Sequence, residues 1–130
     1  MYKTILMMLL AVVSSSAMAE WLVAGSNDKA TIYVDQPSIH KSSSVVKMRT
    51  LFDFKIASNG LISLIMKDEY DCKKKQCRGS LDYYSGRMGT GKKTSNAIGK
   101  WKPVVPHTFG DAQWKFACGI NTQLPFPTPF

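Results

Sequence analysis

Hydrophobic and polar side chains alternate most clearly in the middle of the chain, between Val46 and Ile56. The apolar positions that share one face with Thr50 are Val46, Met48, Phe52, Phe54 and Ile56. The opposite face carries Lys47, Arg49, Asp53 and Lys55, with Leu51 as the exception. A period of two residues is that of a β-strand with one buried face. We therefore expect a half-buried antiparallel strand with a basic outer face.

Other β-rich segments flank this strand. They cover residues 20–24, 30–35, 61–72 and 77–85, and a weaker one lies within 92–98. Turn-forming residues separate them at 25–28, 41–44, 58–60 and 73–76, and Pro37 is expected to interrupt the second segment. Successive strands joined by hairpin-like turns predict a meander.

The 61–72 segment places a charged residue on its apolar face. The apolar positions are Leu64, Met66, Tyr70 and Cys72. Asp68 shares their side of the strand, because it is two residues away from Met66 and from Tyr70. A buried carboxylate is costly without a partner, so Asp68 needs either a partner or an edge position.

One helix is predicted near the end of the chain. Thr108 can serve as its N-cap with Asp111 three residues later, and Gly119 follows as a C-cap residue. Its apolar face would consist of Phe109, Ala112, Gln113, Phe116 and Ala117. A helix of about three turns is too short to be stable alone in water. It must be held by the rest of the protein, and Cys118 in its last turn is the candidate for doing so.

The two ends of the chain differ in composition from this domain. Residues 1–19 have an early Lys3, an apolar run and a small-residue stretch that ends in Ala19, which is the pattern of a cleavable signal peptide. We expect cleavage after Ala19 and export to the periplasm or the cell surface, with no transmembrane span. The mature domain would cover residues 20–120, followed by a proline-rich tail over 121–130.

The net charge of +8 favours acidic partners, such as acidic glycans, anionic membrane surfaces or acidic proteins. Nucleic acid would fit this charge, but export argues against it. At least two of the three cysteines should pair in an oxidising compartment. Spacing alone leaves two alternatives open: Cys72 with Cys77 across a hairpin, or Cys72 with Cys118.

No motif for catalysis or cofactor binding is complete. The segment Gly86–Lys93 resembles a phosphate loop, but Lys93 stands where Ser or Thr would bind magnesium. His40 and His107 lie in no recognisable nucleophile context, and their spacing does not suggest a zinc site. We therefore expect a non-enzymatic protein without a metal or cofactor.

The densest basic cluster is the turn that contains Lys73, Lys74, Lys75 and Arg78. It could be a docking point for a polyanion, or a solvated hairpin tip that keeps the sheet soluble. Lys47 and Arg49 on the neighbouring strand would extend it into a patch. These six residues are the candidate ligand-binding residues.

Several short motifs together resemble the bacterial surface-adhesin protein E family. They begin with Tyr33-Val34-Asp35, Pro37-Ser38-Ile39 and Val46-Lys47-Met48. They continue with Glu69-Tyr70-Asp71-Cys72, Tyr83-Tyr84-Ser85-Gly86, Met88-Gly89, Trp101-Lys102-Pro103-Val104, Trp114-Lys115 and Ala117-Cys118-Gly119. The set covers nearly the whole mature chain and is specific as a linked set.

This resemblance implies an α+β fold: a meander-like antiparallel sheet of about six strands, with the C-terminal helix on one face. It also implies that a Cys72–Cys118 disulfide tethers the helix, while Cys77 departs from the family pattern and would stay free or link two chains. The family's founding member is a lipoprotein adhesin that binds host matrix proteins such as vitronectin and laminin and can dimerise. The expected function is thus an exported binding module for host matrix proteins or acidic glycans. The alternative is a periplasmic structural or stress-related domain without a host ligand.

Overall fold

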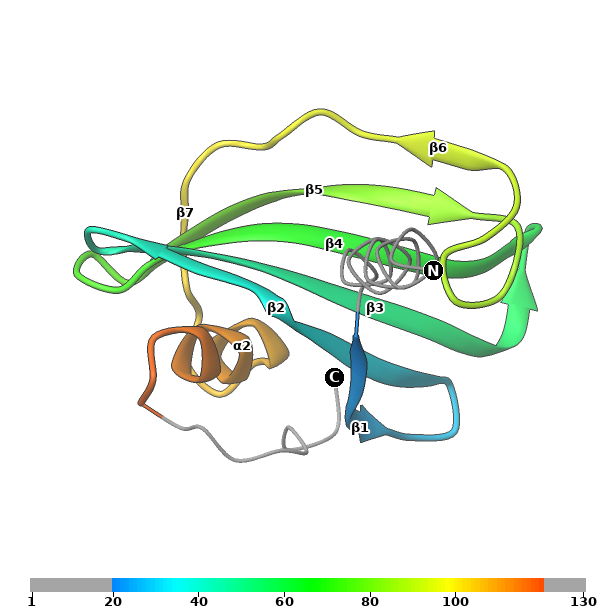
Figure 1. Ribbon diagram of the computed structural model, residues 1–130, viewed down its shortest axis with the longest axis horizontal. Helices are drawn as coiled ribbons and strands as arrows, with labels where there is room; N and C mark the ends of the chain where they lie inside the picture. The colour runs from blue at the N-terminus through cyan, green and yellow to red at the C-terminus, as the bar shows by residue number, and fades with distance from the viewer. Residues whose placement is uncertain (1–19, 121–130) are drawn as a thin grey trace, which may run out of the picture.

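The computed structural model describes residues 20–120, which form one antiparallel sheet with a helix beside it (Figure 1). The expected signal peptide and proline-rich tail lie outside these residues. The strands are β1 (Trp21–Ser26), β2 (Ala30–Ser42), β3 (Val45–Ser58), β4 (Leu61–Asp71), β5 (Gln76–Tyr84), β6 (Lys93–Ser95) and β7 (Lys102–Pro103). The helix α2 spans Phe109–Ala117.

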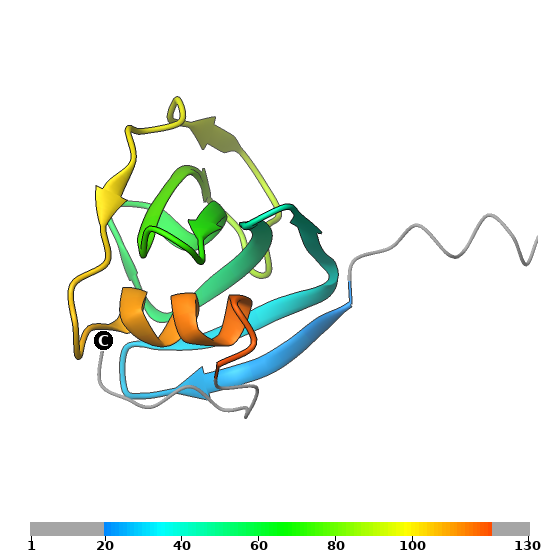
Figure 2. The ribbon, with the colours of Figure 1, turned by 90° about the vertical axis from the view of Figure 1, so that its left-hand side faces the viewer.

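Strand order in the sheet follows chain order from β1 to β6, which confirms the predicted meander. The two-residue strand β7 pairs with the start of β5, beyond the reach of β6. The sheet is strongly twisted and curled, as the end view shows, and α2 lies against one side of it (Figure 2). Among residues 20–120, no helix is long and apolar enough to cross a bilayer.

The prediction that Pro37 interrupts the second strand was wrong, because β2 continues through it to Ser42. Only the pairing with β3 is disturbed, since its register shifts between Asp35 and His40. Within this irregularity the hydroxyl of Ser38 donates to the Asp35 carbonyl at 2.6 Å and accepts from the Arg49 amide at 3.0 Å. A proline fits here because its missing N–H is not required by the ladder.

The face of the sheet toward α2 holds the main core and matches most of the predicted alternation. Val46, Met48 and Phe52 are buried there, and the Phe109 ring meets Phe52 edge-on at 5.4 Å. Ile56 does not follow the prediction, since 77% of it is exposed. It lies beyond Asp53, where β3 leaves regular register with β4, and so outside the covered part of the sheet.

Leu51, the apolar exception on the opposite face, is covered by the loop over residues 85–92. A Cβ on Gly89 would lie 2.9 Å from Ile65 and 3.5 Å from Leu51, so the loop backbone packs directly on these two side chains. The buried hydroxyl of Ser63 fixes it, donating to the Gly86 carbonyl at 2.6 Å and accepting from the Gly89 amide at 2.9 Å. The backbone of Gly89 has a φ of +70°, which glycine adopts readily.

The predicted helix caps are present. The Thr108 hydroxyl accepts from the Asp111 amide at 3.2 Å, and Asp111 in return accepts from the His107 amide at 3.1 Å. Gly119 follows the C-cap residue Cys118 with a φ of +75°. The helix boundaries are therefore set by the local signals that the sequence contains.

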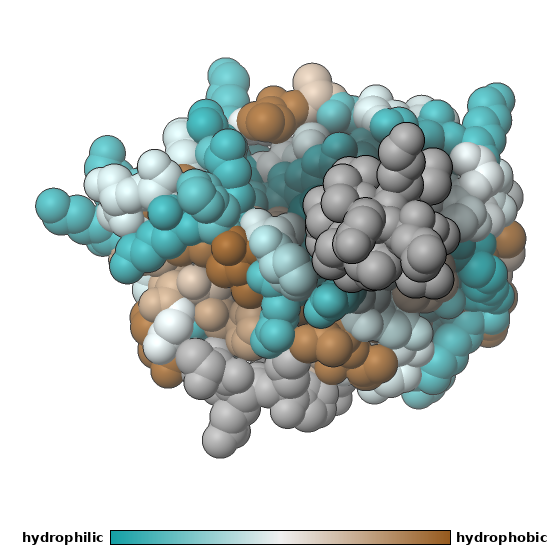
Figure 3. Space-filling model, in the orientation of Figure 1, coloured by the Kyte–Doolittle hydropathy of each residue, from teal (hydrophilic) through white to brown (hydrophobic). Residues whose placement is uncertain are grey.

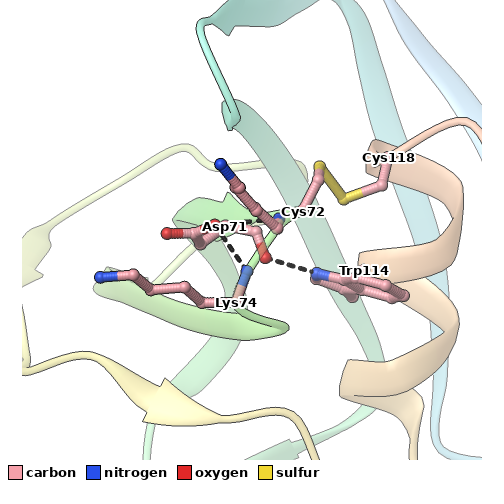
Figure 4. Close-up of a disulfide and its surroundings, with 6 residues drawn as sticks. Asp71, Cys72, Lys74, Trp114 and Cys118 are labelled. Atoms are coloured by element: carbon pink, nitrogen blue, oxygen red, sulfur yellow. Dashed lines mark hydrogen bonds between the residues drawn. A yellow bond between two sulfur atoms is a disulfide. The ribbon is translucent and has the colours of Figure 1, made fainter.

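A disulfide joins Cys72, just after β4, to Cys118 at the end of α2 (Figure 4). Beside it the indole N–H of Trp114 donates to the Asp71 carbonyl at 3.0 Å. On the inner side of the helix, the buried amide of Gln113 donates to the Thr50 hydroxyl at 3.2 Å. The short helix is thus held covalently, by hydrogen bonds and by ring packing.

Candidate binding surface

The sheet face that points away from α2, called the outer face from here on, carries most of the basic residues of interest. The strand register aligns Lys47, Glu69 and Arg78 in one row across β3, β4 and β5. The neighbouring row contains Arg49, Lys67 and Ser80. The two rows lie near the end of the sheet where the β2–β3 and β4–β5 turns project.

The β4–β5 turn presents Lys73 and Lys74 to solvent at the tip of a hairpin. The Asp71 carboxylate accepts hydrogen bonds from the backbone amides of Lys73 and Lys74, at 3.0 and 2.9 Å, and so shapes the turn. The Lys74 side chain extends away from α2 (Figure 4). Teal, hydrophilic side chains project from this end of the molecule, whereas brown, hydrophobic surface gathers around α2 and β1 (Figure 3).

Lys75, the third lysine of the predicted cluster, is directed toward the helix instead. Its ammonium lies 3.7 Å from the Asp111 carboxylate and 5.3 Å from the centre of the Trp114 ring. Asp111 is buried and also lies 3.4 Å from Lys115. Lys75 therefore helps to seat the start and middle of α2, and contributes less to the surface than its two neighbours.

Arg78 and Arg49 are both engaged in ion pairs on the outer face. Arg78 pairs with Glu69 at 3.0 Å and stacks over Trp101 at 4.6 Å. Arg49 pairs with the buried Asp35 at 2.5 Å and lies 5.4 Å from the centre of the Trp21 ring. The two arginines are therefore held in place by carboxylates and aromatic rings, and their charge is partly compensated.

Lys67 is oriented in the same way by the buried Asp82, at 2.9 Å. Burial alone would raise the pKa of Asp82, but hydrogen bonds from Ser95 and Lys67 outweigh it and lower that pKa. The carboxylate is therefore ionised at neutral pH. Lys47, in contrast, is exposed and has no carboxylate within ion-pair distance among residues 20–120.

A hollow of about 320 Å³ lies over the two rows of charged residues and is called the outer-face groove from here on. Its polar lining includes Lys47, Arg49, Lys67 and Glu69. Ser38 of the β2 irregularity, Ser80 of β5 and Ile98 of the segment after β6 also line it, together with Met48 and Asp68. The structure thus brings Lys47 and Arg49 together in one groove, while Lys73 and Lys74 project from the neighbouring turn.

Sequence reasoning missed several residues of this surface. Ser38 and Ser80 carry no signal of their own, because their place depends on the β2 irregularity and on strand register. Ile98 was assigned only to a weak strand, yet 58% of it is exposed at the groove. The nearest available signal was the pair Trp21 and Trp101, which are half-buried beside Arg49 and Arg78, since aromatic residues are common at binding surfaces.

Asp68, the acidic residue predicted on the apolar face, is half-buried there and has a partner. The Tyr70 hydroxyl donates to Asp68 at 3.0 Å. Burial raises the pKa of Asp68 to about 6, although the hydrogen bond from Tyr70 opposes this. Gly79 on β5 leaves the space that Asp68 occupies, because a Cβ there would lie 1.9 Å from its carboxylate oxygen.

Cys77 is unpaired and half-buried, and it packs against the core across from Tyr70. Burial raises the pKa of its thiol, which favours the protonated form at neutral pH. No group of three or more His, Cys, Asp or Glu side chains within residues 20–120 is arranged to hold a metal ion. The arginines of the outer face are engaged in ion pairs and aromatic contacts.

Comparison with known proteins agrees with the motifs found in the sequence. The model of the family described as surface-adhesin protein E matches residues 21–119. No curated protein matches the chain significantly. Crystal form II of Haemophilus influenzae protein E superposes with a TM-score of 0.58 at 12% identity, covering 82% of this chain and all of that one.

Protein E from non-typeable Haemophilus influenzae gives a TM-score of 0.55 at 14% identity, covering 81% of this chain and 79% of that one. At such low identity these two structures support the shared fold alone. The family match, in contrast, extends from the first residue of β1 to the glycine that follows the helix. This chain therefore belongs to the surface-adhesin protein E family.

Proposed function

We propose that this protein is a non-enzymatic adhesin that binds an acidic partner, either a host matrix protein or an acidic glycan. Its contact surface would be the basic end of the sheet, made of the β4–β5 turn and the adjoining outer face. Family membership supports adhesion and export, and the surface charge supports the kind of partner.

The observation that carries this proposal is the position of three uncompensated lysines. Lys73, Lys74 and Lys47 are exposed, and none of them has a carboxylate within ion-pair distance in the described part of the chain. They lie at the same end of the sheet, because Lys47 is paired with Glu69, two residues before the end of β4. Like charges concentrated at one end produce a positive potential that attracts a polyanion over about a Debye length.

The test is charge reversal at the tip, with a matched control at the other end of the sheet. The double variant K73E/K74E should weaken binding to immobilised heparin and to purified vitronectin by about tenfold at low salt. The control K29E/K55E makes the same change in net charge, and these two exposed lysines lie together near the start of β2. Binding of the control should change much less, and raising the salt concentration should remove the difference.

If both double variants lost binding equally, net charge would matter and the basic end would not. If neither variant nor salt had an effect, the electrostatic basis would be wrong. Lys75 should be left intact in these variants because it contacts Asp111 and Trp114.

Adhesion also requires that the basic end be accessible from outside the cell. Brief protease treatment of intact cells should remove the protein if it is surface-exposed. The alternative, a periplasmic structural domain, predicts that the protein is degraded only after the outer membrane is permeabilised.

A further inference from the structure

We propose that the outer-face groove is a binding site for a short peptide segment that presents a carboxylate beside an aliphatic side chain. The inference rests on the proposed adhesive function and names the ligand class for one part of the surface. The groove has a volume of about 320 Å³, at the lower end of the range for small-ligand sites.

The cations of the groove are fixed in position before any ligand binds. Asp35 accepts from Nε and Nη2 of Arg49, so the Nη1 donors of the guanidinium stay available within the described structure. The side chain of Arg49 is 37% exposed, although the Asp35 carboxylate below it is buried. A guanidinium oriented in this way can donate to a ligand carboxylate with little further loss of conformational freedom.

Lys67 and Lys47 add positive charge in the same groove. Asp82 holds the Lys67 ammonium at 2.9 Å, while 48% of the lysine side chain remains exposed. Lys47 has no such counterion and can turn toward a ligand. Two oriented cations and one adaptable cation therefore converge on a space that suits a single carboxylate group.

The apolar side of the groove is formed by Ile98, whose backbone position is also fixed. The backbone on both sides of Ile98 is bonded to β5, since the Asn96 amide donates to the Leu81 carbonyl at 2.9 Å and the Gly99 amide to the Gly79 carbonyl at 3.0 Å. Ile98 is therefore exposed to solvent on a backbone segment that hydrogen bonds fix against β5. Contact with an aliphatic ligand side chain would remove this apolar surface from water.

The mixed charge of the groove favours a peptide over a densely sulfated glycan. Glu69 lines the groove together with the three cations and with Asp68, and it is paired with Arg78. A regular array of sulfates would meet this carboxylate, with an unfavourable like-charge contact. A peptide can place one carboxylate at the cations, an aliphatic side chain at Ile98 and a backbone N–H at Glu69.

The proposal can be tested by two-dimensional ¹⁵N NMR titration of the folded, disulfide-bonded protein. The probe is N-acetyl-Leu-Glu-Leu-amide, with N-acetyl-Leu-Gln-Leu-amide as its uncharged match and a heparin tetrasaccharide as the glycan arm. The Leu-Glu-Leu peptide should shift the amides of Lys47, Ser80 and Ile98 saturably. The Leu-Gln-Leu peptide should bind at least about fivefold more weakly, because it lacks the carboxylate.

Two exposed positions allow matched variants. Ile98→Ser and Lys47→Gln should each weaken peptide binding by about threefold to tenfold. Ile56→Ser and Lys29→Gln make the same changes at exposed positions outside the groove and should have no effect. A thermal unfolding curve for each variant checks that it is folded.

The inference is overturned if the peptide causes no saturable shifts at the groove, or if the glutamine peptide binds as well. It is also overturned if the tetrasaccharide shifts the groove amides more strongly than the peptide does. The variant K73E/K74E separates the two proposals, because it should weaken heparin binding while leaving peptide affinity nearly unchanged. If it weakens heparin binding but the peptide does not bind, the adhesive surface stands without the groove ligand.

Discussion

The two faces of the sheet bury their apolar residues by different means. On one face α2 covers a continuous core, and a disulfide, an indole hydrogen bond and a buried amide attach the helix. On the outer face the loop over residues 85–92 packs on Leu51 and Ile65, which are buried. Elsewhere on that face Arg49, Lys67 and Arg78 form ion pairs with carboxylates.

The helix face therefore contributes mainly to folding stability, and the outer face mainly to recognition. Removing a contact on the helix face should cost folding free energy, whereas most changes on the outer face should alter binding. Partly exposed ion pairs contribute little to stability but fix side chains in space. The following predictions test how far this division holds.

The largest effect is expected from the disulfide. The double variant C72S/C118S should lose about 3–4 kcal/mol of unfolding free energy, because the cross-link constrains the unfolded chain across a sequence separation of 46 residues. Urea unfolding followed by circular dichroism measures this loss. Cys77→Ser is the control, since Cys77 is unpaired. A loss below about 1 kcal/mol would show that noncovalent contacts alone hold the helix.

A similar but pH-dependent effect is expected from Asp68 on the helix face. Its pKa of about 6 in the folded state exceeds the ordinary value of 3.8, so the folded protein binds this proton more tightly than the unfolded chain. Stability should therefore rise as pH falls from about 7 to about 4, by up to about 3 kcal/mol.

The comparison variant is Asp68→Asn, which keeps an oxygen for the Tyr70 hydroxyl. Its unfolding free energy should lack this rise over the same pH range. Asp82 and Asp111 have lowered pKa values, so their stabilising contribution is lost only below their ordinary value of 3.8. Equal pH profiles for the two proteins would mean that the carboxyl group is not buried in solution.

An intermediate effect is expected where the loop covers the outer face. Ser63→Ala removes a buried hydroxyl that bonds to Gly86 and Gly89, and should destabilise the protein by about 1–3 kcal/mol. Hydrogen exchange should show the loop amides of Met88 and Gly89 becoming less protected. Wild-type stability in this variant would mean that the outer-face loop is not part of the cooperative structure.

The smallest effect on stability is expected within the β4–β5 turn, where two neighbouring lysines can be compared. Lys75→Ala should lower the unfolding free energy by about 1 kcal/mol or less, because it removes a partly exposed contact with Asp111 and Trp114. Lys74→Ala, one residue away, should stay within about 0.5 kcal/mol of wild type. In heparin binding the order should reverse, with Lys74→Ala the more affected variant.

Local signals in the sequence predicted much of the fold. Alternation located β3 and β4, and Thr108, Asp111 and Gly119 marked the ends of the helix. The meander followed from short turns, and the disulfide pairing from the family resemblance, whereas cysteine spacing alone left it open. These features depend on neighbours in sequence or on recognisable motifs, which is why they could be predicted.

The features that sequence reasoning missed depend on strand register. The partner of Arg49 is Asp35, and the partner of Lys67 is Asp82, so each pair is 14 or more residues apart and joined only by the sheet. Lys75 was grouped with Lys73 and Lys74 by adjacency, although its side chain contacts the helix. The prediction that Pro37 breaks the strand failed for a similar reason, because Ser38 compensates the ladder there.

The order of strands has a consequence for how the chain reaches this structure. Each strand from β2 to β6 pairs with the strand before it in the chain. The sheet can therefore grow from the N-terminal end by successive short loop closures. None of the strands β1 to β5 needs a strand from much later in the chain to pair with its neighbour along this path. The attachment of α2 joins segments that are distant in the chain, so oxidation can follow as a late step on a sheet that is already assembled.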